Sequence, residues 1–154
     1  MPENMWLLTY DVERMYPSMD INDTLTTLKN GLPHIFKAKK SFWFHILALI
    51  LRNNYICAQD TIKRQKVGIA TGSAVATAIA NLYLHFKYRP VFKRNIKHII
   101  THRRYVDDGI VFTRSETAAE QIATELDEAS SLNITNEICD EEAIFLDLRI
   151  YKGS

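Results

Sequence analysis

The chain has 154 residues, of which 47% are hydrophobic and 24% charged, with a formal net charge of +1. This balance predicts one globular domain with a core and excludes an intrinsically disordered chain. A nearly neutral charge excludes a uniformly basic surface, so any contact with nucleic acid depends on local patches. Such basic patches lie within residues 36–40, 62–66, 86–94 and 97–104.

The first elements predicted along the chain are a strand and two helices. The apolar run at residues 5–12 predicts a buried strand. Asp20 or Asn22 is expected to cap a helix that continues to about residue 30. A second helix over residues 41–53 is apolar on nearly every side, which predicts a central position in the core.

Two hairpins follow, separated by a helix. Alternating polar and apolar residues predict the first hairpin over residues 54–68, with Gln59 and Asp60 near its turn. The helix is expected over residues 71–89. The second hairpin is expected over residues 98–114. We place its turn at Val106-Asp107-Asp108-Gly109, because an Asp-Gly pair is a strong hairpin signal.

The last elements complete an α+β pattern. Residues 116–131 predict an amphipathic helix, residues 140–143 a solvated loop, and residues 143–152 a last strand pair or an edge strand. The order β, α, α, hairpin, α, hairpin, α, β predicts an antiparallel sheet with helices packed on one face.

Three aspartates are candidate metal ligands. Asp11 ends the first strand, and Asp107 and Asp108 lie on the turn of the second hairpin. If that strand and hairpin are neighbours in the sheet, three carboxylates converge and repel one another unless a cation is present. Magnesium fits, because it is a hard cation that takes oxygen ligands, and two such ions about 4 Å apart clamp a phosphoryl transfer. The alternative is a solvated Asp-Asp-Gly turn.

Three segments in order resemble motifs of reverse transcriptases. LLTYDVERMYPSMD resembles the first-aspartate motif, GIATGSAVATAIANLYL the Gly-rich motif before a helix, and RRYVDDGIVF the Tyr-x-Asp-Asp motif. The chain is most similar to Penelope-like retroelement reverse transcriptases, through NYICAQDTIKRQKVGIATGS and FLDLRI. This resemblance implies a single polymerase palm domain of the ferredoxin/RRM-like type over residues 1–154. Residues 20–68 would be at most a remnant of the fingers, and we expect the canonical fingers N-terminus and the thumb to be absent.

The resemblance also implies roles for individual residues. Asp11, Asp107 and Asp108 would be catalytic and hold two Mg²⁺ ions, for which Mn²⁺ substitutes, with the backbone carbonyl of Val12 as a further ligand. Tyr16 would exclude a 2′-hydroxyl from the nucleotide sugar; the alternative is a core tyrosine. The remaining implied contacts are those to the nucleotide, from Gly72 and Ser73, and those to nucleic acid, from Lys63, Arg64, Lys66, Gly68, Arg104 and Tyr105. The alternative for the basic residues of the first hairpin is a solvated surface. The alternative for Tyr105 is an ordinary strand aromatic, and the alternative for the glycines is a turn.

The activity implied is extension of a primer 3′-hydroxyl with deoxynucleotides on an RNA or DNA template. A truncated or domesticated palm that binds nucleic acid without turnover is the alternative. Tyr16 argues against a third reading, an RNA-directed RNA polymerase. Missing fingers or thumb segments, or a second copy of the chain, are the expected protein partners. Residues 132–145 hold no lysine, so no proton donor to pyrophosphate is assigned.

The cysteines, the N-terminus and the longest apolar run indicate the cellular compartment. Cys57 and Cys139 lack zinc-ligand spacing, which indicates a reducing compartment. The N-terminus lacks a signal-peptide pattern, and the longest apolar run, residues 42–51, is too short to span a membrane. We therefore expect an intracellular protein without a membrane partner, and nucleus and cytoplasm are not distinguished.

Overall fold

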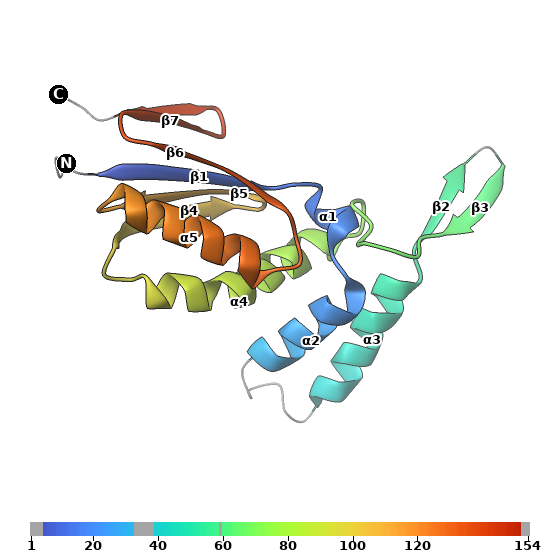
Figure 1. The fold of residues 1–154 in the computed structure, drawn as a ribbon. Coiled ribbons are helices and arrows are strands. Elements are labelled where there is room, and N and C mark those ends of the chain that lie inside the picture. The colour runs from blue at the N-terminus through green and yellow to red at the C-terminus, as the bar shows by residue number, and fades with distance from the viewer. Residues whose placement is uncertain (1–4, 33–38, 59, 152–154) are drawn as a thin grey trace. The chain divides into compact units, whose positions relative to one another are not determined.

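The computed structural model in Figure 1 describes residues 5–32, 39–58 and 60–151. The chain divides into two compact units, the first made of residues 1–13 and 87–154 and the second of residues 14–86. Among the described helices, none combines the length and the apolar character that crossing a membrane requires.

The first unit is built on an antiparallel sheet with the strand order β4-β5-β1-β6. Strand β1 (Trp6–Val12) lies inside the sheet, between β5 (Asp108–Thr113) and β6 (Ile134–Cys139). Strand β4 (Ile99–Tyr105) pairs with β5 at the edge. The first strand of the chain is therefore a central strand, and both of its neighbours come from the second half of the sequence.

The two faces of this sheet are covered differently (Figure 1). Helix α5 (Glu116–Ala129) and the last part of α4 (Ala76–Arg94) cover one face. The short hairpin of β7 (Glu142–Phe145) and β8 (Leu148–Tyr151) lies against the other.

Side chains alternate between these faces along β1, as they must in a strand. Leu8 and Val111, which are cross-strand partners, are fully buried. Met5, Leu7 and Ala143 form a smaller buried cluster under the β7–β8 hairpin. The open part of that second face therefore begins at Thr9, which is half-buried.

The second unit contains short helices and a hairpin. Asp20 caps its second helix, because the Asp20 carboxylate accepts a hydrogen bond of 2.7 Å from the backbone N–H of Asp23. Its elements, besides the first part of α4, are α1 (Met15–Ser18), α2 (Ile21–Gly31), α3 (Lys40–Arg52), β2 (Tyr55–Ala58) and β3 (Thr61–Arg64).

The predicted α+β class, with an antiparallel sheet and helices on one face, is confirmed, but helix α4 is displaced from its prediction. It begins at Ala76 and runs through Pro90 to Arg94. Residues 71–75 form turns instead, in which the N–H of Ala76 donates to the carbonyl of Ser73 at 3.0 Å. The ring of Pro90 removes one backbone hydrogen bond without ending the helix.

Strand β6 was not predicted from the sequence. It pairs with β1 from Leu7–Cys139 to Val12–Ile134. Its middle residues are polar and exposed, so the apolar alternation typical of a strand is weak there. The predicted loop over residues 140–143 is also wrong in part, because β7 begins at Glu142 and Ala143 is buried.

The predicted central position of the second helix is wrong. Within α3 only Leu51 is buried, and the exposed fractions of Phe42, Trp43 and Leu49 are 58%, 55% and 61%. Among the described elements, α3 packs mainly on α2. Because a single neighbouring helix covers only one stripe of a helix, the other apolar sides of α3 stay exposed.

Candidate metal and nucleic-acid site

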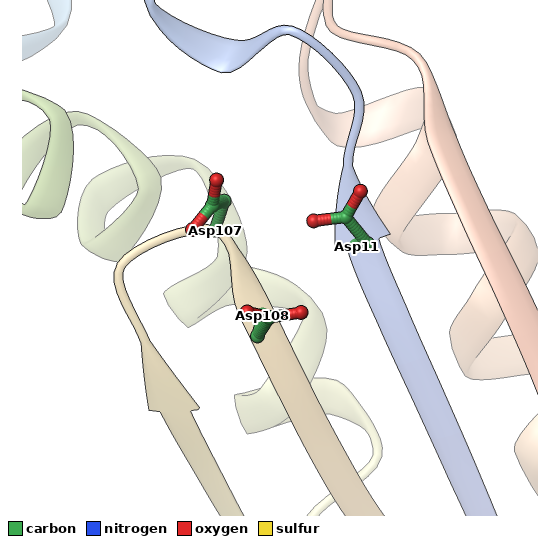
Figure 2. Close-up of side chains that lie close together, drawn as sticks. All are labelled: Asp11, Asp107 and Asp108. Carbon is green, nitrogen blue, oxygen red and sulfur yellow. The ribbon is translucent and has the colours of Figure 1, made fainter. Parts of the chain in front are cut away.

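Three carboxylates meet at one end of the sheet (Figure 2). Asp11 lies near the end of β1, Asp108 begins β5, and Asp107 lies in the turn before it. One carboxylate oxygen from each aspartate lies within 4.8 Å of the other two. The convergence expected from the sequence is present because β1 and β5 are antiparallel neighbours in the sheet.

The hairpin that carries Asp107 and Asp108 has its turn one residue earlier in the sequence than predicted. Val106 and Asp107 form the turn, whereas Asp108 and Gly109 already belong to β5. Val106 has φ = 55°, a left-handed conformation that is rare for a β-branched residue. The guanidinium of Arg104 donates a hydrogen bond to the Val106 carbonyl and so supports this turn.

The electrostatics of the cluster reflect crowded negative charge. Burial, followed by the charges of Asp107 and Glu13, raises the pKa of Asp11 above its ordinary value, and a hydrogen bond with the Val12 backbone partly opposes this. Burial, followed by the charges of Asp107 and Asp11, raises the pKa of Asp108. A bound cation would offset this repulsion.

The donor set fits a hard divalent cation. All three side chains are half-buried carboxylates, which are the oxygen ligands that such ions prefer. Ligands on opposite sides of one Mg²⁺ lie about 4.2 Å apart, which is the scale of the oxygen separations in this cluster.

A cavity of about 350 Å³ adjoins the cluster between the open sheet face and the tip of the β7–β8 hairpin. Its polar wall comes from the sheet and includes Asp11 and Asp108, and its apolar wall comes from the hairpin. The other lining residues are Thr9, Tyr10, Gly109, Thr135, Asn136, Glu137, Ile144, Phe145 and Leu146. Sequence reasoning missed this cavity, because it depends on the unpredicted strand β6.

Tyr16 and the glycine-rich segment belong to the second unit and pack together there. The Tyr16 carbonyl accepts a hydrogen bond of 2.8 Å from the N–H of Ile69, and its hydroxyl lies 3.2 Å from Thr77 Oγ1. Gly68 has φ = 77°, and a Cβ added there would lie 2.5 Å from the Pro17 carbonyl oxygen. Close packing against α1 therefore explains the glycine at position 68.

The other predicted contact residues lie mostly on the surface. Gly72 is exposed, and a Cβ added there would meet no atom within 4 Å. Tyr105 is 64% exposed and pairs with Asp108 across the hairpin. The structure groups the aspartates, Val12, Arg104 and Tyr105 in the first unit; it groups Tyr16, Lys63, Arg64, Lys66, Gly68, Gly72 and Ser73 in the second. The three basic residues of that second group are exposed.

Tyr10 and Gly109 are two further residues of the site that sequence reasoning missed. They are cross-strand partners, each next to an aspartate of the cluster. Burial raises the pKa of the Tyr10 hydroxyl far above its ordinary value, so this hydroxyl stays protonated and neutral. The glycine after the aspartate pair was the available signal, but the Asp-Gly pair was interpreted as a turn.

Comparisons with known proteins give matches to solved structures only. No protein-family model and no curated protein matches the chain. Apo telomerase from Candida tropicalis, truncated from its C-terminal domain, matches with a TM-score of 0.72 and 13% identity over 96% of this chain and 34% of its own. Telomerase from Candida albicans, in complex with a TWJ fragment of telomeric RNA, matches with a TM-score of 0.77 and 10% identity over 96% of this chain and 29% of its own.

A viral enzyme has a similar fold. The RNA-dependent RNA polymerase of a human picobirnavirus matches with a TM-score of 0.69 and 12% identity over 97% of this chain and 29% of its own. The chain thus spans about a third of the length of these polymerases. At such low identity the likeness concerns the fold, and in fold the chain is a polymerase palm.

Proposed function

We propose that the chain is the palm of an RNA-directed DNA polymerase, which extends a primer 3′-hydroxyl with deoxynucleotides. One observation carries this proposal: Asp11, Asp107 and Asp108 converge at the same end of two paired strands, in a palm fold. The narrower assignment to Penelope-like reverse transcriptases rests on the sequence motifs alone.

Asp11, Asp107 and Asp108, with the backbone carbonyl of Val12, would hold two Mg²⁺ ions, or Mn²⁺ in their place. When bound, such ions neutralise developing charge on the phosphate and increase the acidity of the primer hydroxyl. The contribution of the chain is a set of carboxylates that the pairing of β1 and β5 gathers within 4.8 Å of one another. Preorganised charge of this kind requires little rearrangement during the reaction.

The cavity beside the cluster suits the 3′-terminal nucleotide of the primer. Thr9 and Asn136 offer hydrogen-bonding groups on the sheet side, and Ile144 and Phe145 offer apolar surface on the hairpin side. A nucleotide held there would have its sugar hydroxyl beside Asp11 and Asp108. Close positioning of the reacting groups is a large part of catalysis in phosphoryl transfer.

Tyr16 is proposed to select deoxynucleotides. The residue is anchored at two points: its backbone carbonyl accepts a hydrogen bond from the N–H of Ile69, and its ring hydroxyl is hydrogen-bonded to Thr77 Oγ1. An anchored flat ring leaves no room for a 2′-hydroxyl, so it discriminates by exclusion. Gly72 and Ser73 are proposed to approach the same nucleotide, because the space beside Gly72 is open.

Each unit by itself offers candidate contacts to the template and primer strands. Lys63, Arg64 and Lys66 are exposed on or beside β3 and would bind phosphates without reading sequence. In the first unit Tyr105 offers an exposed ring for stacking, and Arg104 lies next to it. Gly68 would contact nucleic acid through its backbone atoms, because the space that a side chain would need is filled by the backbone of Pro17.

The test is primer extension on RNA and DNA templates with Mg²⁺ or Mn²⁺. Wild-type protein is compared with Asp107→Asn and with Asp140→Asn, an equally conservative change in an exposed turn outside the cluster. We expect extension by the wild type and by Asp140→Asn, and none by Asp107→Asn. Undiminished extension by Asp107→Asn would refute the assignment of the cluster.

A second candidate is a nucleic-acid-binding module without turnover, which the exposed basic residues Lys63, Arg64 and Lys66 favour. Fluorescence anisotropy with a labelled RNA–DNA hybrid separates the two. Binding by the wild type without extension, and unchanged binding by Asp107→Asn, would favour the module. Extension gained on adding separate fingers and thumb segments would instead favour the polymerase.

A further inference from the structure

We infer that the Tyr10 ring and Gly109 form an interlock that sets the spacing of Asp11 and Asp108, which makes Tyr10 a positioning residue. This inference rests on the proposed function, since it concerns where the carboxylates are held for metal. We call this pair of residues the Tyr10–Gly109 interlock.

The interlock lies directly behind the cluster. Tyr10 precedes Asp11, Gly109 follows Asp108, and Tyr10 and Gly109 are cross-strand partners. Because side chains alternate along a strand, Tyr10 points to the helix-covered face while Asp11 points to the open face. Figure 2 shows Asp11 and Asp108 on these two neighbouring strands.

The ring occupies the space that any side chain at position 109 would need. A Cβ built on Gly109 would lie 2.0 Å from Cζ of Tyr10, 2.3 Å from its Cε1 and 2.4 Å from its hydroxyl oxygen. Aromatic rings are known to cover a cross-strand glycine in this way and to fix strand register. Gly109 is therefore needed for the ring and not for the turn, which ends at Asp107.

The ring is held where it is. Tyr10 is 3% exposed, and its ring meets that of Tyr88 edge to face, with centroids 6.1 Å apart and planes at 88°. Tyr88 is itself 1% exposed and lies in the part of α4 that belongs to the first unit. Close-packed interiors transmit such constraints, so a methyl group at position 109 would displace strand β5.

Displacement of β5 changes the acid cluster because Asp108 is the residue before Gly109. The carboxylate oxygens lie within 4.8 Å of one another only while β1 and β5 keep their present spacing. Residues that orient metal ligands typically influence affinity strongly. The Tyr10–Gly109 interlock is thus expected to control metal affinity without touching metal.

The experiment measures Mn²⁺ affinity by electron paramagnetic resonance and thermal stability in parallel. Gly109→Ala is expected to bind Mn²⁺ about tenfold more weakly than the wild type. Tyr10→Leu removes the ring atoms that clash yet keeps an apolar side chain, so the double variant Tyr10→Leu/Gly109→Ala is expected to recover most of the affinity. The single Tyr10→Leu variant completes the double-mutant cycle.

Two controls separate positioning from general destabilisation. Gly31→Ala creates a comparable clash in the other unit, where the added Cβ would lie 2.4 Å from Cγ of Phe86. It is expected to lower the melting temperature and leave Mn²⁺ affinity unchanged. Tyr10→Phe keeps the ring and is expected to bind as the wild type does.

The outcomes distinguish this inference from the proposed function. Wild-type affinity in Gly109→Ala, or a double variant as weak as Gly109→Ala, would overturn the interlock alone. If Gly109→Ala does not fold, a folded and Mn²⁺-binding double variant supports the interlock, and a double variant that also fails refutes it. A wild type that binds no Mn²⁺ in an Asp107-dependent way would overturn the proposed function, and the interlock with it.

Discussion

Asp107→Asn is expected to make the metal-free protein more stable. Two unit charges 4.8 Å apart repel by about 0.9 kcal/mol at the dielectric constant of water and by about 3.5 kcal/mol at an effective value of about 20. Asp107 has two such neighbours, Asp11 and Asp108, and all three carboxylates are only half-buried. Solvent screening therefore places the gain in unfolding free energy near the low end, at about 1–2 kcal/mol.

The expected pH dependence follows from the direction of the pKa shifts. The pKa values of Asp11 and Asp108 are raised in the folded protein, so near neutral pH their ionisation favours the unfolded state. The wild type keeps its full stability below the ordinary carboxyl pKa and loses part of it as pH rises through the raised values. The advantage of Asp107→Asn is therefore greatest near neutral pH and vanishes below about pH 4.

The assay is thermal unfolding in a metal chelator across this pH range, with Asp140→Asn as the control. A gain of about 1–2 kcal/mol raises the melting temperature by about 3–6 °C for a chain of this length. Added Mg²⁺ should stabilise the wild type and leave Asp107→Asn unaffected, because ligand binding stabilises only the state that binds. A wild type at least as stable as Asp107→Asn in chelator near neutral pH would refute the reasoning.

Three further predictions concern the second unit. Tyr16→Ala should relax discrimination against ribonucleotides, measured as the ratio of kcat/KM for matched deoxynucleotides and ribonucleotides; an unchanged ratio would remove Tyr16 from this role. The double change Lys63→Gln and Arg64→Gln should weaken the salt dependence of binding to an RNA–DNA hybrid. The slope of the logarithm of the binding constant against the logarithm of the salt concentration should become shallower by about two, and an identical slope would exclude phosphate contacts by these residues. Gly68→Ala should destabilise the protein by about 1–3 kcal/mol, because φ = 77° and the nearby Pro17 carbonyl both oppose a side chain; urea unfolding at wild-type stability would contradict this.

Much of the fold could be predicted because the signals were local. The apolar run before Asp11 and the cap at Asp20 were sufficient to predict β1 and α2. Alternation predicted the hairpin of β2 and β3, and the Asp-Gly pair predicted the hairpin of β4 and β5. The convergence of the aspartates also follows from the sequence if β1 and the second hairpin are neighbours in the sheet.

The remaining features depend on contacts between distant residues. Strand β6 has polar residues Thr135, Asn136 and Glu137, and only its pairing with β1 makes it a strand. The exposure of α3 depends on how many neighbours pack against it, which its own composition does not encode. Gly109 was interpreted as a turn residue because the ring that requires it lies on another strand.

The central place of β1 in the sheet has a consequence for how the protein is made. Its partner β5 follows about 100 residues later and β6 about 130 residues later, so during synthesis β1 emerges long before either can pair with it. At ribosomal rates the delay is about 5–20 s, during which both edges of an apolar strand stay open to other chains. Chaperone dependence during expression is the expected result, and the aspartates come together only after this last, long-range step.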